Sequence, residues 1–112
     1  MSYAFSGCES LRSIAFSKLE TTYVTQMNNV FENCKSLSDI NLQNFDTTEV
    51  TNMKSMFSGC SRLTSLNLKT LNTETVKNMN SMFKECSNLI SLDLNSFDTT
   101  YVTDMGSMFE SL

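Results

Sequence analysis

Residues 53–77 read MKSMFSGCSRLTSLNLKTLNTETVK, and residues 79–103 read MNSMFKECSNLISLDLNSFDTTYVT. The two stretches place Met, Phe, Cys, Leu and Val at the same positions, offset by 26 residues. The four cysteines keep that step along the whole chain, at Cys8, Cys34, Cys60 and Cys86. A fixed period of roughly 20–50 residues is the sequence signature of a repeat protein.

Eight apolar columns follow the same period across the 112 residues, which is more agreement than chance supplies. One column consists only of phenylalanine: Phe5, Phe31, Phe57, Phe83 and Phe109. We predict a single domain over residues 1–112, with units at 1–26, 27–52, 53–78 and 79–104 and a partial unit at 105–112.

The pattern within one unit changes its period. Residues 66–68 alternate apolar, polar and apolar side chains, as a half-buried strand does. Residues 50–57 carry apolar side chains at i, i+3, i+6 and i+7, which is helical spacing. Asp46, with Glu49 three residues later, matches a helix N-cap with a partial capping box. Each unit is therefore predicted to contain a short strand, a turn and about two turns of helix.

One such unit cannot bury its own apolar face, but stacked units can. Parallel strands about 4.8 Å apart turn each apolar column into a ladder inside a solenoid. The predicted fold is an α/β leucine-rich-repeat solenoid of about 4.3 repeats without capping repeats. Its predicted core ladder consists of Phe31, Phe57, Phe83, Cys34, Cys60, Cys86, Leu37, Leu63, Leu89, Ile40, Leu66, Leu92, Leu42, Leu68, Leu94, Val50, Val76, Val102, Met53 and Met79.

The repeated pattern Met-x-x-Met-Phe-x-x-Cys-x-x-Leu-x-x-Leu-x-Leu-x-x-Phe-Asp-Thr-x-x-Val-Thr resembles the repeat of BspA-like leucine-rich-repeat surface proteins. More narrowly, it is similar to the variant found in lipoproteins and wall-anchored proteins of mycoplasmas and Gram-positive bacteria. The resemblance covers the whole chain. It implies an extracellular or cell-surface protein without enzymatic activity, which binds protein or carbohydrate on host or neighbouring cells. The family supplies no catalytic residues to carry over.

The chain departs from that family in a few places. It shows no signal peptide, no anchor and no capping repeat. Leu112 stands where a fifth cysteine would fall. In the first unit, Glu20 stands where the later units have Asp46, Asn72 and Asp98. The surface location is therefore an expectation that rests on the resemblance.

The composition excludes several functions. Without His, the chain has no Ser-His or Cys-His relay and no imidazole metal ligand. The net charge of -4 argues against a protein that binds nucleic acid through its phosphates. No apolar run approaches the roughly 20 residues that span a bilayer. We expect no enzyme, no cofactor, no metal site and no membrane span.

The cysteine column admits three interpretations: a buried ladder, disulfides between neighbouring layers, or a metal site. A single zinc site needs all four sulfurs at about 2.3 Å from one ion. Cys8 and Cys86 lie three layers apart, roughly 14 Å at the layer spacing. Identical side chains on parallel layers point the same way rather than at each other. A buried ladder of free thiols is the favoured interpretation.

Two polar columns border the predicted helix. Thr21, Thr47, Thr73 and Thr99 stand where they would cap its N–H groups, and an exposed threonine array of the ice-binding kind is the alternative. The column that contains Asp46 is predicted to form turns, because its two carboxylates are too few for calcium.

In this architecture the outward side chains of the strands form the expected binding face. They are polar and small, with no aromatic anchor, so they fit either a ligand surface or a merely solvated face. The candidate outer strand face comprises Ser13, Ala15, Ser17, Asp39, Asn41, Gln43, Ser65, Asn67, Lys69, Ser91, Asp93 and Asn95.

Both ends of the predicted stack expose apolar side chains. The candidate stacking residues are Met1, Phe5, Met105, Met108, Phe109 and Leu112. The chain is either a segment of a longer array or a subunit that associates head to tail into a filament. A second copy could not continue the spiral in register, which favours the segment. We therefore predict a non-enzymatic binding and adhesion module of a cell-surface protein, with a self-assembling extracellular filament subunit as the alternative.

Overall fold

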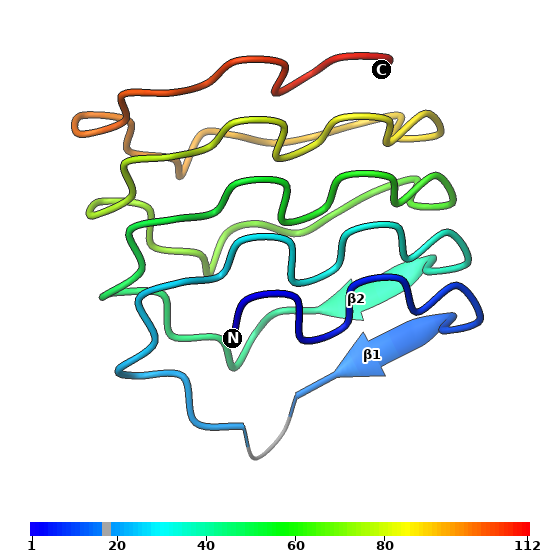
Figure 1. Cartoon of the computed structure of the whole chain (residues 1–112), viewed down its shortest axis with the longest axis horizontal. Coiled ribbons are helices and arrows are strands. Elements are labelled where there is room, and N and C mark those ends of the chain that lie inside the picture. Colours follow the sequence, from blue (N-terminus) through cyan, green and yellow to red (C-terminus); the bar gives the residue numbers. More distant parts are fainter. Residues whose placement is uncertain (17–18) are drawn as a thin grey trace.

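The chain winds into a stack in which each layer lies on the one 26 residues before it (Figure 1). The computed structural model describes residues 1–16 and 19–112. Strand β1 (Ser13–Ala15) pairs in parallel with β2 (Asp39–Asn41), so that Ile14 lies opposite Ile40. A second series of parallel bridges joins successive layers, at Gln26–Asn52, Asn52–Asn78 and Asn78–Asp104. The structure therefore has the repeat architecture that the sequence predicts.

The strands are fewer than predicted. Among the described residues, only β1 and β2 form hydrogen-bonded strands. The corresponding residues 65–67 and 91–93 of the later units continue the stack, and the Ile90 N–H still donates to the Thr64 carbonyl at 3.0 Å. Strand β2 is short because Asn41 Oδ1 accepts the Gln43 N–H at 2.9 Å. This local turn competes with the ladder and ends the strand.

The predicted helices are wrong, because the described residues contain none. In residues 53–60, alternate N–H groups donate to the next layer, as Met53 does to the Asn78 carbonyl at 2.9 Å. Others donate three residues back, as Met56 does to Met53 at 3.2 Å. In an α-helix each N–H would donate four residues back within its own segment. Bonding between layers takes the place of the helical bonds.

Left-handed residues recur twice in every unit and account for the misleading apolar spacing. The two left-handed residues of a unit are four residues apart, and each of them makes a tight turn. A right-handed helix has no such left-handed residues in its interior. Their φ angles lie between 54° and 77°. One column is Tyr3, Asn29, Ser55, Ser81 and Ser107, and the other is Gly7, Asn33, Gly59, Glu85 and Ser111.

The backbone hydrogen bonds between layers run in opposite directions on two sides of the stack. On the side of residues 53–60, N–H groups donate to the layer that follows in the sequence. At the residues just before each bridge of the second series, the N–H groups donate to the layer that precedes. There the Lys77 N–H donates to the Thr51 carbonyl at 2.8 Å, and the Thr103 N–H to the Lys77 carbonyl at 2.9 Å.

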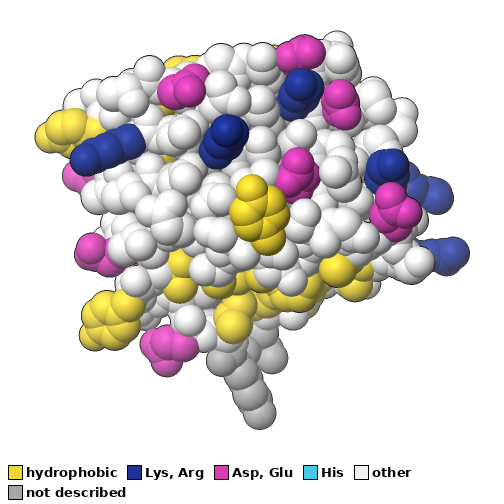
Figure 2. Space-filling model, in the orientation of Figure 1, with side chains coloured by type: hydrophobic (Ala, Val, Ile, Leu, Met, Phe, Trp, Pro, Cys, Tyr) yellow, Lys and Arg dark blue, Asp and Glu magenta, His cyan; other side chains and the backbone are white. Residues whose placement is uncertain are grey.

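The apolar columns fill the interior of the stack. Phenylalanine rings lie almost parallel in successive layers, with centroids 5.6 Å apart for Phe31–Phe57 and 5.8 Å apart for Phe57–Phe83. The core-ladder residues are buried, apart from four that pack half-buried against the core: Leu89, Leu92, Leu94 and Val102. Figure 2 shows charged side chains scattered over the outer surface and hydrophobic ones at the end of the stack near β1.

A buried threonine column joins the layers where a helix cap was predicted. Thr47 Oγ1 donates to the Asn72 carbonyl and accepts the Asn72 N–H, both at 2.7 Å. Thr21 makes the same pair of bonds with the backbone of Asp46, and Thr73 makes it with the backbone of Asp98. The capping role is wrong because no helix follows. The ice-binding alternative also fails for Thr21, Thr47 and Thr73, whose side chains are buried inside the stack.

The carboxylates of the neighbouring column form the predicted turns. Asp46 Oδ1 accepts the Thr48 N–H at 3.0 Å and the Thr48 hydroxyl at 2.6 Å. Asp98 makes the same two bonds with Thr100. Bonds from the threonine hydroxyl and N–H favour the ionised carboxylate, so they lower the pKa of Asp46 and Asp98 below the ordinary value of 3.8.

Candidate binding surface

The predicted outer face is exposed in every layer that the structure describes. Because successive side chains of an extended segment point to opposite sides, the residues between the core positions face outward. The exposed members are Ser13, Ala15, Asp39, Asn41, Gln43, Ser65, Asn67, Lys69, Ser91, Asp93 and Asn95. Ser17 lies outside the described residues.

Local turns fix the middle column of this face. Asn41, Asn67 and Asp93 each accept, through the side-chain oxygen, the N–H two residues further on, at 2.9–3.1 Å. Each side chain therefore keeps a defined direction while its second polar atom faces solvent. A surface that is ordered before binding loses less conformational entropy when a partner arrives.

Two shallow hollows meet on this face at Asn67 and Lys69. One hollow extends over Asp39 and the other over Asp93. The positively charged Lys69 side chain, which lines both hollows, therefore lies between two carboxylates. The two ion pairs of the described residues both lie elsewhere, at Lys35–Glu9 and Lys84–Glu110. The face offers hydroxyl, amide and charged groups in a regular array, which suits a polar partner.

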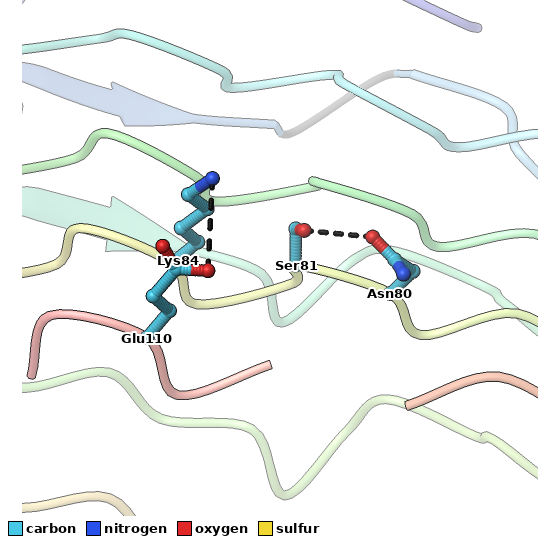
Figure 3. Close-up of polar contacts among 4 residues, drawn as sticks. All are labelled: Asn80, Ser81, Lys84 and Glu110. Carbon is cyan, nitrogen blue, oxygen red and sulfur yellow. Dashed lines mark hydrogen bonds and ion pairs between the residues drawn. The ribbon is translucent and has the colours of Figure 1, made fainter. Parts of the chain in front are cut away.

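The turn segments carry polar side-chain contacts both between neighbouring layers and within one layer (Figure 3). Lys84 Nζ lies 3.7 Å from Glu110 Oε2 in the next layer, and the Ser81 hydroxyl donates to Asn80 Oδ1 at 2.7 Å. An exposed ion pair of this kind contributes about 0–1 kcal/mol. These polar groups are engaged with each other, in contrast to those on the strand face.

A second polar column was missed by the sequence analysis. Asn52 Nδ2 donates to Gln26 Oε1 at 3.1 Å, and Asn80 Nδ2 donates to Asp104 Oδ1 at 3.1 Å. Bonds from the Gly106 N–H and from Asn80 lower the pKa of Asp104. The available signal was the unbroken amide and carboxylate column at Gln26, Asn52, Asn78 and Asp104.

The cysteines are free thiols. Cys34, Cys60 and Cys86 are fully buried, and Cys8 is half-buried. Each buried thiol donates to a phenylalanine carbonyl of the preceding unit at 3.1 Å: Phe5, Phe31 and Phe57 respectively. Burial raises the pKa of Cys34 and of Cys86 to about 11, and it raises that of Cys60 further. Within residues 1–16 and 19–112, no three His, Cys, Asp or Glu side chains gather closely enough to hold a metal.

The candidate stacking residues differ in exposure. Phe109 stacks on Phe83 with centroids 6.1 Å apart, yet 45% of its surface remains exposed. Met105 and Leu112 are also exposed, Met1 and Phe5 are half-buried, and Met108 is buried. Among the described residues, no helix has the length and apolarity that crossing a bilayer requires.

A similar solved structure is a leucine-rich repeat protein from Bacteroides ovatus, with 18% sequence identity and a TM-score of 0.43. The match covers 100% of this chain and 41% of that protein, so the chain spans about two fifths of its length. No curated protein sequence matches the chain.

A family model described as "Mycoplasma protein of unknown function, DUF285" matches residues 1–112. The match extends over every unit that carries the Met-Phe-x-x-Cys pattern and over every layer of the stack. The chain therefore belongs to this family, and it is a BspA-like leucine-rich-repeat protein.

Proposed function

We propose that this chain is a non-enzymatic binding and adhesion module of a cell-surface protein. It engages a protein or carbohydrate partner through the strand face. The observation that carries this function is the flat array of exposed polar side chains, repeated at 26-residue intervals and held in place by local turns. Membership in the Mycoplasma family supports the surface location.

The strand face suits adhesion because many weak polar contacts add up along a rigid surface. Each hydrogen bond contributes only about 0.5–1.5 kcal/mol net. An ordered array makes several such contacts without the entropy cost of arranging its side chains at the moment of binding. A repeat protein gains further contacts by adding layers, since each new layer presents the same columns.

Beads coated with the purified chain test this proposal on cultured epithelial monolayers and on a glycan array. The double variant Ser65→Arg and Ser91→Arg places two bulky side chains on the strand face, where both serines are exposed. We expect it to lower bead attachment at least about tenfold, because arginine blocks close approach. The control, Ser10→Arg and Ser87→Arg, makes the same chemical change at exposed serines in the preceding turns. Equal attachment of the two variants would refute the strand face as the binding surface.

End-to-end self-association is a second candidate, favoured by the exposure of the Phe109 ring in stacking register with Phe83. A further ring on Phe109 would extend the phenylalanine ladder and remove its exposed surface from water. Sedimentation velocity over a wide concentration range tests this directly. Assembly that disappears in Phe109→Glu supports it, whereas a chain that stays monomeric at high concentration contradicts it.

A further inference from the structure

The cysteine column combines three features that each reduce thiol reactivity. The Cys34, Cys60 and Cys86 side chains are removed from solvent. Their S–H groups donate to phenylalanine carbonyl oxygens in the adjacent layer, with Sγ–O distances of 3.1 Å. The same carbonyls also accept a backbone N–H, as that of Phe31 does from Cys34 at 3.2 Å. The thiols are therefore fixed parts of the contact between layers.

We propose that Cys34, Cys60 and Cys86 form a protected thiol ladder, which stays reduced in oxidising surroundings while the stack is folded and makes disulfides unnecessary. The ladder cross-links neighbouring layers through hydrogen bonds instead of covalent bonds. It also keeps three reactive groups away from oxidants and from thiols of other proteins.

The chemistry of thiols explains the protection. Alkylation and disulfide exchange both require a thiolate that the reagent can approach. Burial prevents the approach. Burial also raises the pKa of Cys34 and Cys86 to about 11, which leaves about one thiolate in ten thousand at pH 7. Reaction is therefore expected only when the layer opens.

A disulfide between neighbouring layers is opposed by the same geometry. Two cysteines that join must lose two protons and two electrons to an oxidant, and their sulfurs must approach to about 2.05 Å. Cys34 and Cys60 would both have to abandon their bonds to the Phe5 and Phe31 carbonyls. Their side chains occupy equivalent positions in stacked layers, so both would also have to rotate toward each other. Formation of the disulfide would therefore cost the two S–H hydrogen bonds and the packing around both side chains, and a mild oxidant does not offset that cost.

Pulse labelling of the full chain with iodoacetamide, followed by peptide mapping, measures the reactivity of each cysteine. The reference rate for each site is that of the chain unfolded in guanidinium chloride. We expect Cys34, Cys60 and Cys86 to react at least about a thousandfold more slowly in the folded chain, since opening a core layer costs several kcal/mol. Protection below about a hundredfold at any of the three sites would overturn the proposal.

A positive control shows that the folded chain and the reagent are both competent. Ser65→Cys adds a thiol to the exposed strand face. It is expected to react within about tenfold of its unfolded rate. In a parallel measurement, the folded chain is treated with diamide as the oxidant and its intact mass is determined. An intramolecular disulfide among the three buried cysteines, in a chain with an unchanged near-ultraviolet circular dichroism spectrum, would also overturn the proposal.

Discussion

At the scale of the residue, buried hydroxyls and thiols complete the contacts between layers. Thr47 supplies both a donor and an acceptor to the backbone of Asn72, and Cys60 supplies a donor to Phe31. Such groups are costly to bury unless they are paired, and each of them is paired. No buried side-chain nitrogen or oxygen of the described residues lacks a partner.

Thr47→Val tests the threonine column. The substitution keeps the shape of the side chain but leaves the Asn72 N–H and carbonyl without their partner. We expect a loss of about 1–3 kcal/mol in the free energy of unfolding, measured by urea denaturation. Thr47→Ser, which keeps the hydroxyl, should cost about 1 kcal/mol or less. Thr99→Val, in the same column but exposed, is the control at about 0.5 kcal/mol or less. Equal losses at positions 47 and 99 would contradict the role of the hydroxyl.

The turn carboxylates predict a dependence of stability on pH. The pKa of Asp46 and Asp98 is lower in the folded chain than the ordinary value of 3.8. Their contribution to stability is therefore complete above about pH 4 and is lost as the pH falls through the lowered folded pKa. We expect the urea midpoint to fall along this range.

The double variant Asp46→Asn and Asp98→Asn isolates that contribution. It should show a shallower fall below about pH 4, because it no longer titrates at these turns. An amide oxygen can still form the turn, as Asn72 does by accepting the Glu74 N–H at 2.9 Å. Asp39→Asn removes an exposed carboxylate from the strand face and serves as the control. A slope identical to that of the parent chain would refute the assignment.

At the scale of the element, the left-handed residues shape each layer. Gly7 and Gly59 occupy one such column, and Glu85 adopts the same conformation at φ 59° with a side chain that strains it. At Gly59, an added Cβ would also collide with the side-chain oxygen of Asn33 in the preceding layer. The turn geometry therefore depends on small residues at only some of the equivalent positions.

Glu85→Gly is expected to stabilise the chain. Relief of the left-handed conformation gains about 1–2 kcal/mol, and the added freedom of the unfolded glycine costs about 0.5–1 kcal/mol. The net gain in the free energy of unfolding should be up to about 1 kcal/mol, measured by urea denaturation. Glu74→Gly changes an exposed glutamate that is not left-handed, so it should destabilise by about 0.5–1 kcal/mol. If both variants lose stability equally, strain at Glu85 is absent.

The sequence predicts the stacking of the layers better than it predicts the backbone conformation within a layer. The period of Phe57 and Leu66 reveals the stacking and the buried columns because burial depends on side-chain polarity. The turns around Ser55 escaped prediction because two successive left-handed turns produce nearly the same apolar spacing as a helix. Nothing about a serine signals a positive φ, whereas Gly59 is compatible with one. Thr47 was misassigned because a helix cap and a contact between layers favour the same residue type.

The candidate surface was predictable to a similar degree. Alternation along residues 66–68 identifies Asn67 as outward-facing, and the structure exposes it. The bond that the Lys69 N–H donates to the side-chain oxygen of Asn67 follows from the ordinary turn chemistry of asparagine. The second polar column at Asn52 was missed because its amides pair across layers, which requires knowledge of the register.

At the scale of the whole molecule, each layer depends on its neighbours for burial. The thin core contains one ladder of rings and a few aliphatic columns, so damage to a central layer affects both sides. The apolar side chains of Leu66 and Leu68 lie in such a layer, with exposures of 8% and 1%.

Leu66→Asp should unfold the stack. It places an unpaired charge in the central core. The cost of removing that charge from water is comparable to the whole stability of a typical domain, about 5–15 kcal/mol. We expect the far-ultraviolet circular dichroism of the variant to resemble that of the denatured chain. Asn67→Asp changes the adjacent outward residue, keeps an oxygen for the Lys69 N–H and should stay within about 0.5 kcal/mol of the parent. An unchanged melting curve for Leu66→Asp would refute the inward position of that column.

The reversed direction of hydrogen bonding on the two sides of the stack has an electrostatic consequence. An α-helix sums its peptide dipoles into about half an elementary charge at each end. Here the N–H groups of Met53, Ser55, Phe57 and Gly59 donate to the following layer, whereas around Lys77 only those of Lys77 and Asn78 donate to the preceding one. The opposing dipoles therefore cancel only in part along the stacking axis, and each added layer increases the net dipole. The two ends of the stack differ in sign, so a charged molecule that approaches along the axis is attracted or repelled according to the end it meets, whatever side chains the layers carry.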